Sequence, residues 1–218
     1  MALSYYITAR GQLDSPGGQN ASEEALCEKV RAAFLAGMDY VQVREKDLPD
    51  GRLARLVEEL RTLREKTAAE KPVPGKTASR LLVNERLDIA VSSGADGVHL
   101  PSDSLPLAVV RSHVGPAGIV GISCHSEEDV EQAARDGASY VLFGPVFETP
   151  SKPGGEPLGI PLLGRICRRS PVPVFALGGV NRDNAESCVR AGAAGIAGIR
   201  LFQRDPDLAG LCRYLGGL

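Results

Sequence analysis

Short apolar runs, rich in β-branched and aromatic residues, alternate along the whole chain with longer amphipathic segments. The apolar runs predict β-strands, and the amphipathic segments predict helices. Strands are expected at residues 5–8, 40–44, 81–84, 97–100, 118–123, 140–143, 172–177 and 195–199. Helices are expected at residues 22–36, 51–66, 86–93, 105–113, 126–136, 161–168 and 182–191.

A weak internal repeat supports this alternation. The pieces GMDYVQV, GADGVHL, GASYVLF and GAAGIAG each start with a glycine and run into an apolar strand. Such a glycine ends the preceding helix in a left-handed conformation. Ser22, Ser126 and Asn181 are placed to cap helices. Eight strands alternating with helices favour a (β/α)₈ TIM barrel, formed by residues 1–218 as one domain, over an open doubly wound sheet.

The open sheet remains the alternative, because periodicity alone does not show that a sheet closes. The segment TAAEKPVPGKT, residues 67–77, lacks a hydrophobic period and carries proline and lysine. It is expected to form an exposed loop before the third strand.

Composition narrows the class of protein. Hydrophobic residues make up 43% and charged residues 24%, with a formal net charge of −2, which favours neither nucleic acid nor an anionic membrane as a partner. The first ten residues, MALSYYITAR, do not resemble a signal peptide, and no apolar run is long enough to span a bilayer. The five cysteines are widely spaced, which indicates reduced thiols and a cytoplasmic location.

In a TIM barrel, catalytic groups stand at the C-terminal ends of the strands. After the second strand, Gln42, Arg44 and Lys46 follow one another at a spacing of two and predict one polar row. Buried in a barrel, such a row needs a ligand or a partner. The alternative is a solvated strand end.

Other strand ends carry further candidates. Asn84 and Glu85 follow the third strand, where they could hold a metal or a heteroaromatic ring, or simply begin a helix. His125 follows the fifth strand and suits proton transfer near neutral pH, although a structural histidine is the alternative. Cys124 beside it has no basic neighbour that would activate the thiol. Asp103, after the fourth strand, is expected to cap a turn.

Two loops predict a phosphate site. Gly178 and Gly179 follow the seventh strand, and Gly198, Ile199 and Arg200 follow the eighth. These are the usual positions for a barrel phosphate site built from backbone amides. The stretch FGPVFETPSKPGGEPLG, residues 143–159, adds Thr149, Ser151 and Lys152 as further groups that could hold an anion.

The chain resembles the thiamin phosphate synthase / TenI family in an ordered set of segments that covers nearly its whole length. The matching pieces are YYITAR, VQVREKDL, LLVNERLDIA, GADGVHL, VGISCHS, YVLFGPVFETPSK, PVFALGGVNRDNA and AGAAGIAGIR. The resemblance implies a TIM barrel, a role in thiamin biosynthesis and a phosphorylated thiazole as ligand.

One branch of this family, the synthase, joins hydroxymethylpyrimidine diphosphate to a thiazole phosphate with loss of pyrophosphate, using Mg²⁺. The resemblance implies a pyrophosphate site at Gln42, Arg44, Lys46, Asn84, Ser123, Thr149, Ser151 and Lys152. It places the two magnesium carboxylates at Glu85 and at position 104, where this chain has Ser104. Asp103 is one residue away from that position and is expected to point elsewhere.

The other branch, the TenI thiazole tautomerase, isomerises a carboxythiazole phosphate to its aromatic form without a metal, and the resemblance makes His125 its acid/base residue. The missing carboxylate leads us to expect tautomerase chemistry with no cofactor, with the Mg²⁺-dependent synthase as the alternative. A non-catalytic, phosphate-binding regulatory barrel is the third hypothesis. The expected partner is a small thiazole phosphate, and the oligomeric state stays open, a homodimer included.

Overall fold

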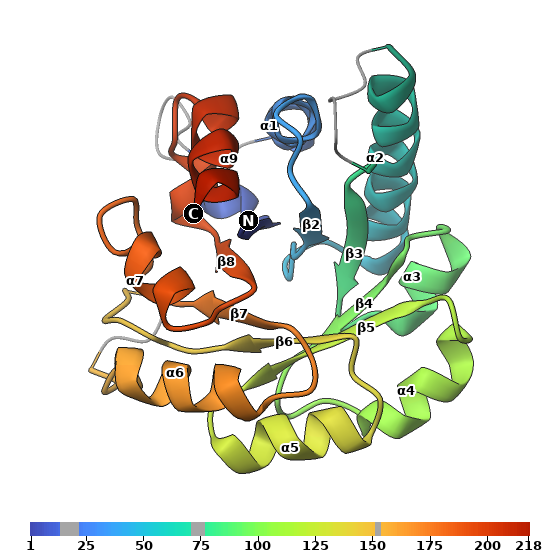
Figure 1. Cartoon of the computed structure of the whole chain (residues 1–218). Coiled ribbons are helices and arrows are strands. Elements are labelled where there is room, and N and C mark those ends of the chain that lie inside the picture. The colour runs from blue at the N-terminus through green and yellow to red at the C-terminus, as the bar shows by residue number, and fades with distance from the viewer. Residues whose placement is uncertain (14–21, 71–76, 151–153) are drawn as a thin grey trace.

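The structure is a closed barrel of eight parallel strands, given by a computed structural model that describes residues 1–13, 22–70, 77–150 and 154–218 (Figure 1). Each strand pairs with the next, and the last pairs with the first, so the expected barrel is confirmed and the open sheet is wrong. The strands are β1 (Leu3–Ile7), β2 (Tyr40–Val43), β3 (Arg80–Asn84), β4 (Gly97–Leu100), β5 (Ile119–Cys124), β6 (Tyr140–Phe143), β7 (Val174–Leu177) and β8 (Gly195–Gly198).

Alternate residues of each strand face the barrel interior. The interior cluster contains Tyr5, Tyr140 and Phe175, which are fully buried and pack with their ring centres 5.5–5.6 Å apart. The intervening residues, such as Val41 and Val141, face outward and belong to the larger core between the barrel and its helices. The barrel is therefore a packed core rather than a pore.

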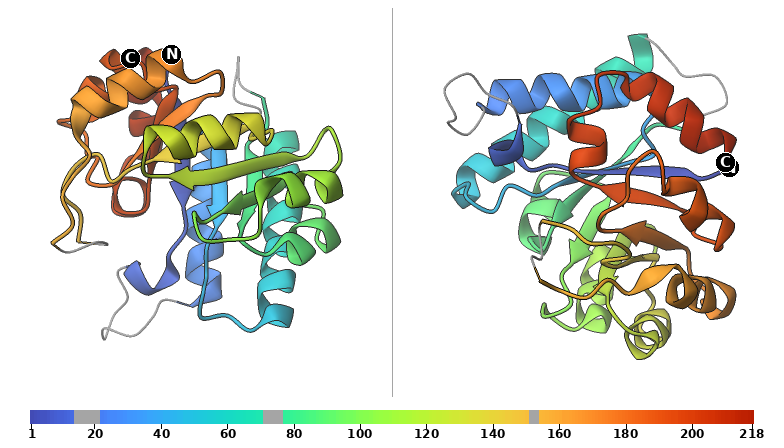
Figure 2. Two further views of the ribbon diagram at one scale, coloured as in Figure 1. Left: turned by 90° about the horizontal axis from the view of Figure 1, so that it is seen from below. Right: turned by 90° about the vertical axis from the view of Figure 1, so that its left-hand side faces the viewer.

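The helices surround the barrel on its outside (Figures 1 and 2). They are α1 (Glu23–Leu35), α2 (Asp50–Glu70), α3 (Leu87–Ser92), α4 (Leu107–Val114), α5 (Glu127–Arg135), α6 (Gly159–Arg169), α7 (Ala185–Arg190), α8 (Arg200–Gln203) and α9 (Leu208–Gly217), with a short 3₁₀ turn, η1 (Arg10–Gln12). The two termini lie side by side, because α9 packs against β1 (Figure 2).

Two of the three expected helix caps form. Asn181 does not cap α7, which begins at Ala185 after Asn184, and its side chain accepts from the amides of Asp183 and Asn184 instead. The Ser22 hydroxyl accepts a hydrogen bond from the amide of Ala25, and Ser126 forms a reciprocal capping box with Asp129. All four glycines of the internal repeat have positive φ, from 67° at Gly94 to 104° at Gly192, which glycine adopts without steric cost.

Some expected boundaries are wrong. Helix α2 continues to Glu70 and buries Thr67, whose hydroxyl donates to the Leu63 carbonyl, so residues 67–70 are helical and the expected loop at residues 67–77 is wrong there; residues 71–76 lie outside the described ranges. Helices α8 and α9 were not expected. None of the helices in the described part of the chain is long and apolar enough to cross a membrane.

Gly121 in β5 lies directly against the buried ring of Tyr140. A Cβ atom at Gly121 would lie 2.0 Å from Cζ of the buried Tyr140 ring, so we expect Gly121→Ala to destabilise the protein by about 1–3 kcal/mol. The control is Gly51→Ala in α2, whose added Cβ would meet nothing closer than 3.8 Å. Urea unfolding of both variants checks this, and equal stability of the two would contradict the packing described here.

Candidate functional site

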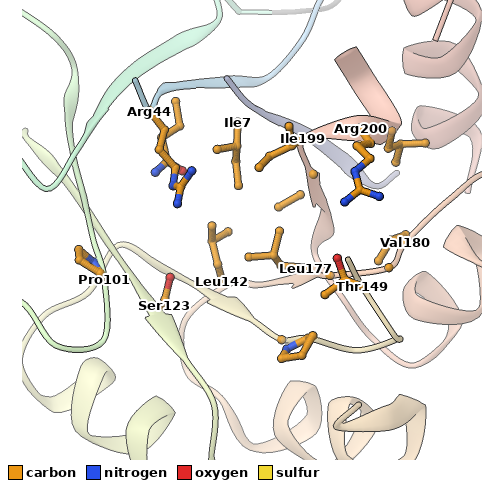
Figure 3. Close-up of a pocket in the computed structure, with 18 of the residues that line it drawn as sticks. Ile7, Arg44, Pro101, Ser123, Leu142, Thr149, Leu177, Val180, Ile199 and Arg200 are labelled. Atoms are coloured by element: carbon orange, nitrogen blue, oxygen red, sulfur yellow. The ribbon is translucent and has the colours of Figure 1, made fainter. Parts of the chain in front are cut away.

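A cavity of about 840 Å³ opens at the C-terminal ends of the strands, where sequence reasoning placed the chemistry. Its volume lies in the upper part of the range for small-molecule sites. Four aliphatic side chains, Ile7, Leu142, Leu177 and Ile199, form an apolar strip across its floor (Figure 3). Arg44 and Arg200 lie at opposite ends of this strip (Figure 3).

One end of the cavity carries the polar residues that follow β2 and β3. Gln42, Arg44, Lys46 and Asn84 all line it, so the structure brings the predicted polar row to one wall. Gln42 is buried and its amide nitrogen donates to Asn84 Oδ1 at 2.9 Å, whereas Lys46 is exposed to solvent. Two cations and an amide thus face an open volume, an arrangement suited to an anion.

A buried carboxylate, Glu45, holds this wall in place. It accepts hydrogen bonds from the Thr8 hydroxyl at 2.6 Å and from the Arg10 amide at 2.9 Å. The Thr8 hydroxyl in turn accepts a hydrogen bond from the backbone amide of Arg44 at 3.0 Å. Burial raises the pKa of Glu45, against the effect of these hydrogen bonds. The loops after β1 and β2 are thereby joined beneath Arg44 and Lys46.

The opposite end is built from the glycine-rich loops after β7 and β8. Gly178, Gly179, Gly198, Ile199 and Arg200 all line the cavity there. Gly178 and Gly179 have φ of 91° and 67°, and a Cβ at either would lie within 2.7 Å of the loop after β6. Only glycine permits this close approach, which leaves backbone and the Arg200 guanidinium facing the cavity.

The loop after β6 lies against the glycine-rich loop after β7 and is hydrogen-bonded to it. Gly144 precedes a cis proline, and the amides of Val146 and Phe147 donate to the carbonyls of Leu177 and Gly178 at 2.9 and 3.0 Å. Thr149 lines the cavity (Figure 3). Ser151 and Lys152, the other two candidates in this loop, lie outside the described residues.

His125 lines the cavity at the end of β5. Its Nδ1 atom contacts the Gly144 carbonyl oxygen, which can only accept, so Nδ1 carries a hydrogen; the His125 backbone amide donates to Asp129. The neighbouring Cys124 is buried, and burial raises the pKa of its thiol to about 12. The thiol of Cys124 is therefore not activated as a nucleophile, and the sequence had also indicated that it is not.

The carboxylates expected to bind a metal are not gathered at the cavity. Glu85 is exposed, has a φ of 65° and does not line it, and neither does Ser104. Asp103, in the turn after β4, does line it. Within the described ranges, no three His, Cys, Asp or Glu side chains come together as metal ligands.

Sequence reasoning missed a set of buried polar side chains beneath the cavity. His99 is 2% exposed, with Nδ1 3.0 Å from the Tyr140 hydroxyl and Nε2 3.0 Å from the Ser123 hydroxyl. Tyr140 contacts Tyr5, which donates to Gln42. The alternation of β4 indicates that His99 points into the barrel. The sequence of that strand alone does not reveal which polar groups His99 contacts there.

Comparisons with known proteins agree with one another. The family model TMP-TENI, described as thiamine monophosphate synthase, matches residues 15–202. The chain is 41% identical over 204 residues to a putative thiamine-phosphate synthase of Geobacter sulfurreducens, covering 93% of this chain and 87% of the relative. It is 42% identical over 196 residues to the thiamine-phosphate synthase of Roseiflexus castenholzii, covering 89% and 82%.

A solved structure is similar over the same length. The thiamine phosphate pyrophosphorylase from Pyrococcus furiosus superposes with a TM-score of 0.79 at 28% sequence identity, covering 99% of this chain and 94% of that chain.

The burial of His99 has a consequence for the pH dependence of stability. Burial lowers the pKa of His99 to about 3, so the folded protein excludes a proton that the unfolded chain binds below its ordinary pKa of 6.5. Stability is thus expected to fall as pH drops from about 6.5 to about 3, by roughly 1.4 kcal/mol per pH unit for this group. Urea unfolding between pH 7.5 and 4 measures the slope. His99→Gln is expected to lose this part of the slope, and an unchanged slope would contradict the burial of a neutral histidine.

Proposed function

The chain belongs to the TMP-TENI family of thiamine monophosphate synthases, and from this premise we propose that it is a thiamine-phosphate synthase. The reaction joins hydroxymethylpyrimidine diphosphate to a thiazole phosphate and releases pyrophosphate. The names of the relatives favour this reaction over the tautomerisation that the sequence led us to expect.

The observation that carries the proposal is the presence of two anion-binding ends in one cavity. Arg44 and Lys46 lie at one end and Arg200 with the glycine loops at the other, with an apolar strip between them (Figure 3). Two phosphorylated substrates that bring their rings together would place their charges at the two ends and their rings on the strip. The glycine end is the usual place for a barrel phosphate, so we assign the thiazole phosphate to it.

The proposed roles follow from where charge develops in this reaction. The thiazole nitrogen donates its lone pair to the pyrimidine methylene carbon, and the bond from that carbon to the diphosphate oxygen breaks. Pyrophosphate leaves with both bonding electrons. Arg44, Lys46 and the Asn84 amide would stabilise the charge that grows on this leaving group, while the opposite end holds the nucleophile in reach. Thr149, which lies near Val180 at the Arg200 side of the cavity, would contact the thiazole phosphate (Figure 3).

Magnesium, which the family resemblance implies, would neutralise charge on the diphosphate when bound. The chain does not offer the expected pair of carboxylates, because Glu85 lies outside the cavity and position 104 is a serine. Mg²⁺ usually binds through one or two carboxylates together with substrate phosphates. Asp103 alone does not make a complete site, so no step of the proposed reaction is assigned to a metal.

Tautomerisation of a carboxythiazole phosphate is the second candidate. It is favoured by His125, which lines the cavity and whose Nδ1 hydrogen is donated to the Gly144 carbonyl, so that Nε2 is the ring nitrogen that would transfer the proton. Proton transfer by a positioned group contributes roughly 10²–10⁴-fold. A tautomerase, however, has no use for a leaving-group site at Arg44 and Lys46.

The proposal predicts that the purified protein makes thiamin phosphate and pyrophosphate from the two substrates. Arg44→Met should lower kcat/KM by roughly 10²-fold, because it removes a charge aimed at the leaving group. Arg52→Met is the control, since Arg52 lies on α2 and pairs with Glu23 away from the cavity. Quantifying thiamin phosphate by its oxidised, fluorescent form provides the measurement.

Two other results would each favour another candidate. Absence of thiamin phosphate, with conversion of the carboxythiazole tautomer that His125→Ala abolishes, would replace the synthase by the tautomerase. Binding of thiazole phosphate with neither activity would indicate a regulatory barrel.

The metal requirement gives a further prediction. Glu85→Gln should leave both the rate and the magnesium concentration for half-maximal rate within about twofold of wild type, because Glu85 does not line the cavity. Asp103→Asn is the matched comparison, and any change in magnesium dependence is expected only there. Loss of the magnesium dependence of the rate in Glu85→Gln would show that Glu85 does bind the metal, and would contradict this prediction.

A further inference from the structure

A continuous chain of hydrogen bonds crosses the barrel interior beneath the cavity. It runs from Asn84 on β3 to Ser123 on β5 through Gln42, Tyr5, Tyr140 and His99, with successive donor–acceptor distances of 2.9, 3.0, 2.7, 3.0 and 3.0 Å. Tyr5 and Tyr140 are fully buried. The two ends of the chain, Asn84 and Ser123, line the cavity.

The orientation of the Gln42 side-chain amide sets the direction of the bonds that follow it, because Tyr5, Tyr140 and the neutral His99 ring each have one hydrogen to give. Gln42 donates its amide hydrogen to Asn84 Oδ1 and accepts the Tyr5 hydroxyl hydrogen at Oε1. Tyr5 has then used its one hydrogen, so its oxygen accepts from Tyr140. Tyr140 in turn has used its hydrogen and accepts from Nδ1–H of His99.

The direction continues to the surface of the cavity. A neutral histidine carries one ring hydrogen, here on Nδ1, so Nε2 accepts the Ser123 hydroxyl hydrogen. Burial, which lowers the pKa of His99 to about 3, keeps the ring neutral. Burial also raises the pKa of both Tyr5 and Tyr140, so neither phenol ionises.

We propose that this chain makes His99 and Tyr140 positioning residues, which hold the Ser123 hydroxyl as a hydrogen-bond acceptor and the Asn84 amide as a donor toward the bound substrate. The inference deepens the proposed synthase function and rests on it for the substrate. It changes one expectation drawn from the family resemblance, because a Ser123 oxygen that has given its hydrogen to His99 cannot donate to a pyrophosphate oxygen. Asn84 can, since its Oδ1 is engaged by Gln42 and its amide hydrogens are left for the ligand.

The polarity of the chain is tested by the protonation state of His99 in the substrate-free protein. Nitrogen-15 NMR of histidine-labelled protein distinguishes the two ring nitrogens, with His99→Gln assigning the signals. We expect Nδ1 to carry the hydrogen and Nε2 to lack one from pH 5 to pH 9. An Nε2–H ring, or a charged ring in this range, would overturn the proposal. The result does not depend on any catalytic activity, so a failed synthase assay leaves it intact and identifies the proposed function as the part that is wrong.

A pair of tyrosine variants links the polarity to function. Tyr140→Phe keeps the ring but removes the acceptor of Nδ1–H, so His99 should shift to the Nε2–H form, which donates to Ser123. Tyr40→Phe is the matched control, because Tyr40 packs against Tyr5 and Tyr140 in the same cluster but takes no part in the chain.

The tyrosine pair also has a kinetic readout. Tyr140→Phe should lower kcat by about tenfold with a smaller change in KM, and Tyr40→Phe should stay within about twofold. The positioning role is refuted if Tyr140→Phe retains Nδ1–H, or if it shifts the hydrogen to Nε2 without lowering kcat. Should Tyr140→Phe fail to fold, the wild-type spectrum still decides the polarity.

Discussion

Closure of the eight strands forces alternate residues of every strand into one small interior, and the rest of the site depends on how that interior is satisfied. A buried polar group costs free energy unless it is hydrogen-bonded. Gln42 and His99 are 1% and 2% exposed, so each must find its partner inside the barrel. Gln42 is hydrogen-bonded to Tyr5, and His99 is hydrogen-bonded to Tyr140. These bonds set which polar groups at the cavity wall donate and which accept.

A second consequence of closure is that the loops after neighbouring strands meet at one end of the barrel. Glu45 joins the loops after β1 and β2 beneath the cationic end of the cavity. At the other end, the lack of a Cβ at Gly178 and Gly179 allows the loops after β6 and β7 to touch. Both ends are therefore held by bonds that no ligand supplies, which is the preorganisation that catalysis of a charge-separating step requires.

The sequence predicted the barrel because the relevant signals are local. Strand runs, capping serines and left-handed glycines each act within a few residues, and all eight strands appear close to their expected positions. Helix α9 was not predicted, because the glycines within it weaken the local preference for a helix. Its buried residues nevertheless have helical spacing: Leu208, Leu211, Cys212 and Leu215.

The site was predictable as far as it depends on strand ends. Gln42 and Asn84 lie in the last two residues of their strands, Arg44 and His125 come directly after theirs, and all four line the cavity. The sequence did not show that Asp103 lines the cavity and that Glu85 does not, because the placement of a turn residue depends on backbone angles such as the φ of 65° at Glu85. The partners of His99 could not be predicted, because Tyr140 and Ser123 lie 41 and 24 residues away along the chain. Only closure of the barrel brings these side chains together.

The central claim is that the cavity holds two anions at its opposite ends at the same time. Isothermal titration of pyrophosphate into protein already saturated with thiazole phosphate tests it most directly. The account predicts that pyrophosphate binds the saturated protein with a dissociation constant within about tenfold of its value for the free protein, a coupling of at most ~1.4 kcal/mol. Loss of pyrophosphate binding once thiazole phosphate is present would mean that both compete for one site, and would contradict the account.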